Sequence, residues 1–372
     1  RSRVPREVIE KGLPTLKVVG RAGVGVDNID VEAASDNGVI VMNTPGGNTI
    51  SAAEHTMALM LSMARNISRA DYTMHEGRWE KKALTGTELR GKVLGIIGLG
   101  RIGMEVSRRA YGFEMKMLGY DPYVSDEMLS SLHIQRASVE EICREADFIT
   151  VHSPLTAETR GILGAKEFEM MKPTARVINC ARGGIVDEDA LAEALNAGKI
   201  ASAALDVFST EPLPDDHPLR QVDKLILTPH LGAATAEAQE NVAIELAKQI
   251  VDLLKNGEIR NAVNAPSVDP KILADMRPYL RLAEHLGRFQ SQFPEGRIKR
   301  LEILYSGGVL DYPMVPLTTA VAKGFLEMRA EPPINYVNAL RRLKQMGIEL
   351  SDTRSSKIFS YTNLITIEAT TE

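Results

Sequence analysis

Three glycines and one acid in the first third of the chain have the spacing of a site that binds a dinucleotide. Gly98, Gly100 and Gly103 form the pattern G-x-G-x-x-G, and Asp121 follows eighteen residues after the last of them. In such a pattern the first glycine permits a tight turn and the second lets the backbone approach a pyrophosphate. The third lets a helix pack against a strand. A glycine triplet alone is weak evidence, because ordinary turns also contain it.

The segments around the glycines strengthen this interpretation. Residues 92–97 are a mostly apolar run typical of a buried strand, and residues 101–110 have helical spacing with apolar side chains. A second short strand is expected at 115–120, directly before Asp121. Strand, glycines, helix, strand and acid in this order form a dinucleotide-binding unit, with the pyrophosphate on free N–H groups at the helix start. The alternative, a turn that merely tolerates glycine, leaves the acid without a role.

Asp121 predicts which dinucleotide is bound. A carboxylate at the end of the second strand accepts hydrogen bonds from ribose hydroxyls and repels a 2′-phosphate. The next residues are Pro122 and Tyr123, so no Arg or Lys follows to neutralise such a phosphate. The sequence therefore favours NAD over NADP.

Four further polar residues lie at or after the ends of predicted strands, where open α/β sheets bind their ligands. Of the seven histidines, we expect His152 and His230 to end strands, and Arg182 and Glu211 also follow strands. Arg182 could clamp a carboxylate and a carbonyl, His230 could take a hydroxyl proton, and Glu211 could hold the imidazole. This set suits hydride transfer on a 2-hydroxy acid. The alternatives are a structural histidine and, for Arg182 and Glu211, a surface salt bridge or loop cap.

The elements that must position these residues alternate between strand and helix. After Asp121 we expect helices at 138–145, 165–171 and 187–195, and strands at 147–152, 176–180, 201–207 and 224–227. This order predicts a parallel, doubly wound sheet. A long helix runs from Thr235 to about Asn256. Beyond residue 266 the rhythm changes to long helices with a few strands, such as 300–305 and 364–369, which indicates a separate α+β module.

Composition excludes several other classes. The 372 residues are 44% hydrophobic and 25% charged, which indicates a globular chain of two or three domains. A formal net charge of −5 gives no reason to expect a nucleic-acid partner. No apolar run approaches the roughly 20 residues of a membrane helix. Cys143 and Cys180 have no zinc spacing and no disulfide framework, so we expect no metal and a reducing compartment.

The chain begins Arg-Ser-Arg without a methionine. A helix expected at 4–12 and a strand at 16–20 imply a sheet whose preceding strands are not in the sequence. We therefore expect an N-terminally incomplete chain. The expected location is the cytoplasm or, if a transit peptide is missing, a plastid.

Several blocks of sequence resemble the D-2-hydroxyacid dehydrogenase family. They are residues 179–186 (NCARGGIV), 204–212 (ALDVFSTEP) and 228–234 (TPHLGAA). Within that family, residues 21–30 (RAGVGVDNID), 43–46, 86–91 (GTELRG) and 263–266 resemble the phosphoglycerate dehydrogenases. The resemblance is strong to about residue 266. The tail is similar to the intervening domain of the long form, and the regulatory ACT domain of that form is not in the sequence.

The resemblance implies roles for individual residues. The catalytic set would be Arg182, Glu211 and His230. Cofactor contacts would come from the glycine turn with Arg101 and Ile102, from Asp121, and from a set near the nicotinamide or at the next strand end: Val24, Ser153, Cys180, Ala181, Asp206, Gly232 and Ala233. Cys180 is interpreted as a small strand-end residue and not as a nucleophile. The substrate and its phosphate would be bound by Arg1, Ser2, Arg3, Gly23, Arg182 and, from a neighbouring subunit, Lys81.

The resemblance also implies the architecture: two Rossmann-like, doubly wound parallel-sheet domains plus the C-terminal α+β module. Residues 1–45 and 234–262 would form the substrate-binding domain, 46–233 the NAD-binding domain and 263–372 the intervening-type domain. The family is dimeric through its cofactor domains, so we expect a homodimer or homotetramer. Trp79, in the arm 75–84, is placed at that interface. Its alternative role is a local core anchor.

The function implied is NAD-dependent oxidation of 3-phosphoglycerate to 3-phosphohydroxypyruvate, the first step of phosphorylated L-serine biosynthesis. One alternative is a hydroxypyruvate or glyoxylate reductase, or another D-2-hydroxyacid dehydrogenase, and the intervening-type tail argues against it. A second alternative, from another class, is a non-catalytic NAD-sensing binding protein. The intact set of Arg182, Glu211 and His230 argues against that one.

Overall fold

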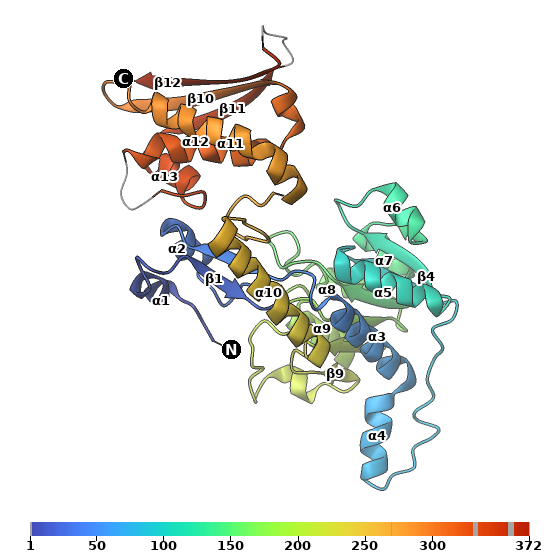
Figure 1. The fold of residues 1–372 in the computed structure, drawn as a ribbon. Helices are drawn as coiled ribbons and strands as arrows, with labels where there is room; N and C mark the ends of the chain where they lie inside the picture. Colours follow the sequence, from blue (N-terminus) through green and yellow to red (C-terminus); the bar gives the residue numbers. More distant parts are fainter. Residues whose placement is uncertain (1, 269, 330–333, 356–360, 372) are drawn as a thin grey trace. The chain divides into compact units, whose positions relative to one another are not determined.

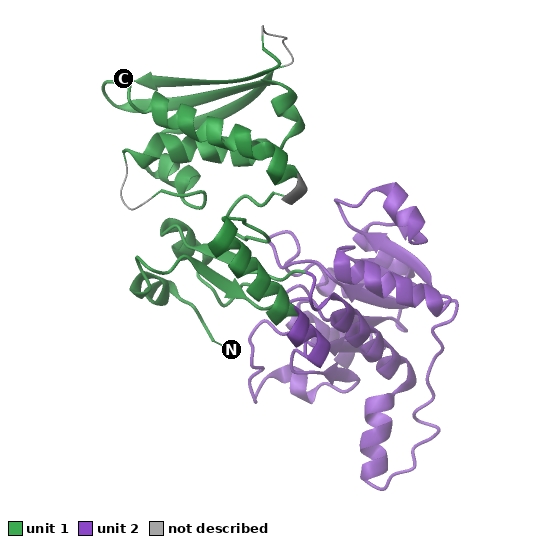
Figure 2. Cartoon of the chain, viewed as in Figure 1, with its two compact units in different colours: residues 1–45, 242–372 green, residues 46–241 purple. Residues whose placement is uncertain are grey.

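The structure is a computed structural model that describes residues 2–268, 270–329, 334–355 and 361–371. The chain forms two compact units (Figure 2). One unit is Gly46–Asn241, and the other combines Arg1–Pro45 with Val242–Glu372. Each unit is described below by itself.

The unit Gly46–Asn241 is built on a parallel sheet of seven strands. Its spatial order is β5-β4-β3-β6-β7-β8-β9 (Figure 1). The strands are β3 (Val93–Ile97), β4 (Lys116–Tyr120), β5 (Ile134–Arg136), β6 (Phe148–Val151), β7 (Arg176–Asn179), β8 (Ser202–Leu205) and β9 (Leu225–Leu227). The order reverses at β3, which pairs with β4 on one side and β6 on the other. Such a reversal is where doubly wound sheets open a crevice for a ligand.

Helices cover both faces of this sheet, as the apolar strands require. The core on one face includes α3 (Thr49–Arg65) and α5 (Arg101–Gly112). The core on the other face includes α7 (Val139–Glu145), α8 (Ala165–Met170) and α9 (Glu188–Asn196). The doubly wound fold predicted from the sequence is thereby confirmed. The unit also contains α4 (Ile67–His75), α6 (Asp126–Ser131) and the 3₁₀ helix η1 (Pro218–Gln221).

Local signals explain where two of these helices begin. The side chain of Asp187 is the N-cap of α9, because it accepts a hydrogen bond from the backbone N–H of Ala190. Ser138 caps α7 through a reciprocal pair of hydrogen bonds with Glu141. The sequence analysis did not predict α6 or β5.

The lobe formed by the first 45 residues contains two parallel strands, β1 (Val18–Arg21) and β2 (Ile40–Asn43). They are accompanied by α1 (Arg6–Lys11) and α2 (Val31–Asp36). A Cβ at Gly20 would lie 2.9 to 3.0 Å from the side chains of Leu246 and Ile250, so this strand packs closely on α10 (Ala236–Asn256). A doubly wound parallel sheet is expected for this lobe. Its described residues form a parallel sheet of two strands, β1 and β2.

The C-terminal module has a three-stranded mixed sheet. The central strand β10 (Ile298–Gly307) pairs in parallel with β11 (Glu349–Ser355) and antiparallel with β12 (Asn363–Thr371). Figure 1 shows α11 (Pro270–Gln290), α12 (Met314–Glu327) and α13 (Ala339–Gln345) on one face, and the 3₁₀ helix η2 is Gly308–Asp311. A Cβ at Gly287 or Gly324 would lie within 2.2 Å of a carbonyl oxygen of the facing helix. The α+β character predicted for this segment is confirmed.

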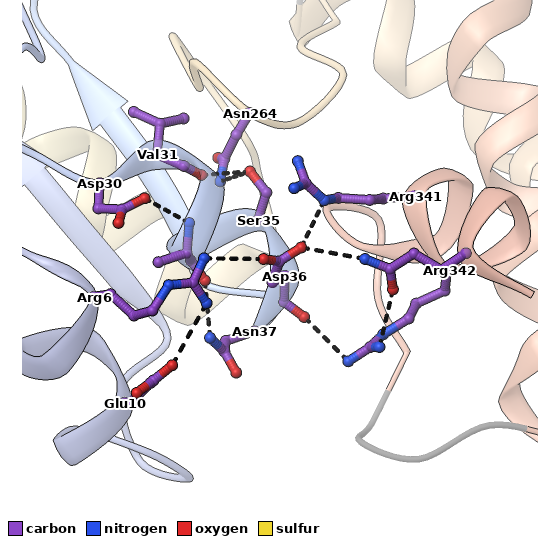
Figure 3. A network of polar contacts seen from close by, with 12 residues as sticks. Arg6, Glu10, Asp30, Val31, Ser35, Asp36, Asn37, Asn264, Arg341 and Arg342 are labelled. Carbon is purple, nitrogen blue, oxygen red and sulfur yellow. Dashed lines mark hydrogen bonds and ion pairs between the residues drawn. The ribbon is translucent and has the colours of Figure 1, made fainter.

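A polar network joins α2 to α13 within the unit that combines Arg1–Pro45 with Val242–Glu372 (Figure 3). The carboxylate of Asp36 contacts Arg6 at 3.3 Å and Arg341 at 2.6 Å, and it accepts a hydrogen bond from Gln345. Nearby, Asn335 donates to the carbonyl of Gly38 at 2.7 Å.

Among the described residues, no helix is long and apolar enough to cross a membrane.

Candidate active site

The turn after β3 needs glycine at two of its three glycine positions. Gly98 has φ +93°, and a Cβ there would lie 2.6 Å from the backbone nitrogen of Ser153. A Cβ at Gly103 would lie 2.2 Å from the carbonyl oxygen of Gly98. At Gly100, by contrast, an added Cβ meets no atom within 4 Å. The turn is therefore tight where it meets neighbouring backbone and open at the glycine that begins the helix.

The start of α5 has the properties of an anion site. Gly100 is the N-cap and supplies no side chain to the first turn, which begins with Arg101 and Ile102. The N–H groups and the dipole of a helix start favour negative charge. At the end of the neighbouring strand β6, the buried hydroxyl of Ser153 and Nδ1 of His152 have no hydrogen-bond partner in the described residues. An open glycine, an uncapped helix start and an unpartnered hydroxyl suit a dinucleotide phosphate.

Asp121 lies at the end of β4, beside the glycine turn. Its Oδ2 accepts a hydrogen bond from the backbone N–H of Leu99 at 2.8 Å, and its Oδ1 accepts one from Tyr123 at 2.9 Å. These bonds hold a carboxylate at the position where the sequence predicts ribose recognition. An acceptor that carries negative charge there is unfavourable for a 2′-phosphate.

Two buried groups near the strand ends are held neutral. Burial raises the pKa of the Cys180 thiol to about 12, so the sulfur is not a thiolate at neutral pH. This supports the interpretation of Cys180 as a small strand-end residue. Burial also lowers the pKa of His152 to about 4, so its imidazole is uncharged. Ala181, after Cys180, is buried as well.

Asp206 follows β8 and is a fully buried carboxylate. It accepts hydrogen bonds from the hydroxyl of Thr228 at 2.6 Å and from the backbone N–H groups of Leu231 at 2.7 Å and Gly232 at 2.9 Å. His55 is a fourth partner, at 3.1 Å. Burial opposes the charge, but these four hydrogen bonds outweigh it and hold the pKa of Asp206 below its usual value. An ionised carboxylate therefore anchors the segment 228–232, and Ala233 follows that segment.

His230 lies in this anchored segment, after β9. Its Nδ1 is 2.8 Å and 2.9 Å from the two carboxylate oxygens of Glu211. Since a carboxylate only accepts hydrogen bonds, Nδ1 carries the hydrogen and Nε2 is left for proton transfer. Oε1 of Glu211 also accepts a hydrogen bond from the backbone of Phe208 at 3.2 Å. The backbone of His230 has φ +56°, an unusual conformation for a residue with a side chain.

Arg182 follows β7, the strand beside β8. The side chain of Asn179 holds this turn, because it donates to the carbonyl of Arg182 at 2.8 Å and accepts from the N–H of Ala181 at 3.0 Å. A Cβ at Gly183 would lie 2.0 Å from the backbone of Phe208, so the turn packs closely on the segment that leads to Glu211. The guanidinium of Arg182 donates a hydrogen bond to the carbonyl of Ala181 at 2.7 Å.

The strand order brings the three turns to one edge. Since β7, β8 and β9 are adjacent and parallel, their carboxyl ends lie side by side, with Arg182, Glu211 and His230 in the turns that follow. The side chains of Glu211 and His230 are 27% and 26% exposed, so a small molecule can reach the pair. The edge combines a cation, a proton acceptor and a carboxylate, which suits acid–base chemistry on a small acid.

The predicted substrate residues lie in both units. In the first 45 residues, Gly23 has φ +143° and donates to Thr44 at 2.7 Å, and the carbonyl of Val24 accepts a hydrogen bond from Asn43 at 2.7 Å. Ser2 and Arg3 are exposed, and Arg1 lies outside the described residues. Lys81 is exposed in the other unit. That these residues act together at one site stays a prediction.

Sequence reasoning missed His55, because it singled out only His152 and His230 among the seven histidines. The signal could not come from local spacing, because Asp206 and Thr228 are 151 and 173 residues away. Among the described residues, no group of three or more His, Cys, Asp or Glu side chains could hold a metal ion.

Two parts of the chain match families of known proteins. Residues 57–232 match the family described as D-isomer specific 2-hydroxyacid dehydrogenase, NAD binding domain. Residues 275–372 match the family described as D-3-phosphoglycerate dehydrogenase intervening domain. A D-3-phosphoglycerate dehydrogenase of Methanocaldococcus jannaschii is 46% identical over 369 residues, which are 99% of this chain and 70% of the relative. The chain belongs to the D-3-phosphoglycerate dehydrogenase family.

This family lies within the NAD-dependent D-2-hydroxyacid dehydrogenases, and NAD is the cofactor of the unit that carries the glycine turn. A D-3-phosphoglycerate dehydrogenase of a Synechocystis species is 45% identical over 370 residues, 99% of this chain and 66% of the relative. The chain thus spans about two thirds of the length of these curated relatives. The crystal structure of an NAD-dependent formate dehydrogenase from Staphylococcus aureus in complex with NAD is 32% identical, with a TM-score of 0.64. That match covers 72% of this chain and 80% of the formate dehydrogenase.

Proposed function

We propose that the enzyme oxidises 3-phosphoglycerate to 3-phosphohydroxypyruvate with NAD, as the first step of phosphorylated L-serine biosynthesis. The observation that carries this proposal is the His230–Glu211 pair at 2.8 Å, which lies at the carboxyl edge of the same sheet that carries the NAD turn. The names of the relatives and the match of residues 275–372 to the intervening domain support the substrate.

In this proposal the chain's own residues bind the substrate and move one proton. Arg182 binds the carboxylate of the substrate and the oxygen on C2 through paired N–H groups. Nε2 of His230 takes the hydroxyl proton as the C2–O bond becomes a carbonyl, while Glu211 orients the ring and balances its new positive charge. NAD, when bound, accepts the hydride that leaves C2.

The roles of the cofactor residues follow the same proposal. The turn from Gly98 to Gly103, with Arg101 and Ile102, would hold the pyrophosphate, and Asp121 would bind the ribose. Ser153 would meet the cofactor at the end of β6. The remaining contacts would line the nicotinamide: Val24, Cys180, Ala181, Asp206, Gly232 and Ala233. The unpartnered hydroxyl of Ser153 and the open face of Gly100 support this assignment.

The phosphate of the substrate needs positive charge that a chain of net charge −5 must supply locally. We assign this role to the basic segment Arg1-Ser2-Arg3, together with Gly23, and to Lys81 of a neighbouring subunit. The exposure of Arg3 and Lys81 supports it, because both side chains are accessible to an anion. Charge-assisted contacts are worth about 1.5–3 kcal/mol each.

Two assays on the full-length enzyme test the proposal. The first follows NADH fluorescence with 3-phosphoglycerate, D-glycerate or D-lactate as substrate, and we expect 3-phosphoglycerate to have the highest kcat/KM. Faster reduction of hydroxypyruvate or glyoxylate would favour the reductases instead. If NADH binds but none of these substrates reacts, the chain is a non-catalytic NAD-binding protein.

The second assay compares Arg3→Ala with the matched control Lys82→Ala, a neighbour of Lys81. Loss of one charge-assisted contact should raise the KM for 3-phosphoglycerate about tenfold in Arg3→Ala. The KM for D-glycerate should hardly change, because that substrate has no phosphate. If both KM values rise together, or if Lys82→Ala has the same effect, the basic segment does not bind phosphate.

We further propose a homodimer or homotetramer, with the arm 75–84 at an interface. In support, the arm and the preceding helix α4 expose Trp79 by 79%, Tyr72 by 59%, Ile67 by 56% and Met74 by 54%. The alternative role of Trp79 as a local core anchor is wrong, because the side chain is exposed.

We also propose a substrate-binding domain of 1–45 and 234–262, an NAD-binding domain of 46–233 and an intervening-type domain of 263–372. The proposed location is the cytoplasm, with a plastid as the alternative, and the two free cysteines support a reducing compartment.

A further inference from the structure

His55 contacts the machinery around His230 from a different element. It lies on the 17-residue helix α3, and its side chain is 19% exposed. Its Nε2 is 3.1 Å from Oδ1 of Asp206 and 3.3 Å from the hydroxyl oxygen of Thr228. Neither the proton transfer nor the proposed cofactor contacts use this histidine.

The partners of His55 fix its tautomer. The carboxylate of Asp206 is ionised and only accepts, so Nε2 must carry the hydrogen and donate it. The Thr228 hydroxyl gives its own hydrogen to the same Oδ1 at 2.6 Å, so its oxygen faces Nε2–H as a second acceptor. A single N–H therefore holds both a buried carboxylate and the hydroxyl next to it.

Asp206 transmits this restraint to the segment that carries His230. Its Oδ1 accepts from Leu231 and its Oδ2 from Gly232, the two residues directly after His230. Thr228, two residues before His230, donates to the same carboxylate. The backbone of His230 is at φ +56°, a conformation that persists when the surroundings hold it. A rotated Asp206 carboxylate would release the segment on both sides of His230.

Helix α3 is a rigid support for this contact. The residues beside His55 on the helix, Ala52, Thr56 and Leu59, are buried, and the hydroxyl of Thr56 is bonded to the helix backbone at 2.8 Å. The imidazole is thus presented to Asp206 from a packed element and not from a loop.

We propose that His55 is a positioning residue, whose Nε2–H fixes the carboxylate of Asp206 and through it the backbone of the segment 228–232. It acts through Asp206 and touches neither substrate nor cofactor. This inference rests on the proposed function, because it assumes that His230 takes the proton.

The test uses three variants of the full-length enzyme. His55→Leu removes the donor, and His55→Gln keeps an N–H group near the position of Nε2. Ser51→Ala is the matched control: Ser51 is one turn away on α3 and bonds Thr235 at 2.7 Å without touching Asp206. For each variant, kcat, the NADH dissociation constant and the hydrogen exchange of the peptide containing Leu231 and Gly232 are measured.

We expect His55→Leu to lower kcat about tenfold, the lower end of what a hydrogen bond to a charged group is worth. The exchange of the amides of Leu231 and Gly232 should become about tenfold faster, because their acceptor is no longer held. The NADH dissociation constant should rise by less than about threefold, because the proposed cofactor contacts at the glycine turn and Asp121 do not depend on His55. His55→Gln should restore kcat and amide exchange to within about threefold of the unmodified enzyme, and Ser51→Ala should leave both unchanged.

Three outcomes would overturn the proposal. They are unchanged amide exchange in His55→Leu, equal defects in His55→Gln and His55→Leu, and equal defects in Ser51→Ala. Amide exchange needs no substrate, so an error in the proposed function and an error in this inference give different results. If His55→Leu does not fold, His55→Gln compared with His55→Asn, whose shorter side chain does not reach Asp206, gives the same contrast.

Discussion

The carboxylates of Asp206 and Asp36 each accept hydrogen bonds from distant parts of the chain, but they differ in burial and in what they hold together. Asp206 is fully buried and binds the backbone on one side of His230 together with side chains of His55 and Thr228. Asp36 is 22% exposed and binds Arg6 and Arg341, whose side chains are 48% and 39% exposed. The first anchors a turn at the carboxyl edge of a parallel sheet, and the second joins two helices.

The difference shows that a high density of charge does not by itself mark a functional site. An ion pair in contact with water contributes about 0–1 kcal/mol, because water and salt screen it. A buried carboxylate costs several kcal/mol to desolvate unless every lone pair finds a donor. The geometry around Asp206 is therefore tightly determined, whereas the network around Asp36 tolerates change.

The largest effect expected at the sheet edge comes from His230. His230→Asn should lower kcat by about 10²–10⁴, the usual value of general acid–base catalysis. The NADH dissociation constant, measured by fluorescence titration, should change little, because the proton acceptor is not a cofactor anchor. A near-normal kcat in this variant would make the His230–Glu211 pair a structural contact, like the network around Asp36.

The next effect concerns Asp121. Asp121→Ser should lower kcat/KM for NAD about tenfold or more, since charged hydrogen bonds to the ribose are lost. Discrimination against NADP should relax, because the negative charge that repels the 2′-phosphate is gone. Steady-state kinetics with both cofactors measure this. Equal kcat/KM for NAD and NADP in the unmodified enzyme would contradict the role of Asp121.

The lowered pKa of Asp206 should also affect stability in acid. The pKa of Asp206 is lowered in the folded protein, so its ionised form adds stability above the ordinary value of about 3.9. That contribution is lost as pH falls through the lowered value. The free energy of unfolding should therefore decrease less steeply below pH 5 in Asp206→Asn than in the unmodified enzyme. Denaturant unfolding between pH 5 and pH 3 tests this, with the exposed Asp71→Asn as control, and equal slopes would disprove it.

The smallest effect is expected in the network of Figure 3. Arg341→Ala removes an ion pair at 2.6 Å between partly exposed side chains, so the free energy of unfolding should fall by less than about 1 kcal/mol. Raising the salt concentration should shrink the difference further. A loss of several kcal/mol in urea denaturation would show that this network is as tightly determined as the surroundings of Asp206.

Much of the sheet could be predicted from the sequence because its signals are local. Apolar runs, the glycine turn at Gly98 and the N-cap Asp187 each act within a few residues of the structure they determine. The order of strands also placed Arg182, Glu211 and His230 at one edge. Contacts between distant segments carry no local signal, so the bonds of Asp206 to His55 and of Asp36 to Arg341 emerged only in the structure. The exposure of Trp79 was undecided for the same reason.

The central claim is that the buried carboxylate of Asp206 supports the activity by holding the segment that carries His230, whereas the partly exposed carboxylate of Asp36 does not. Its most direct test measures kcat/KM for 3-phosphoglycerate in Asp206→Asn and Asp36→Asn side by side. We expect at least a tenfold loss in Asp206→Asn, because the support of His230 is weakened, and a change of less than about twofold in Asp36→Asn. Equal losses in the two variants, or a larger loss in Asp36→Asn, would contradict the account.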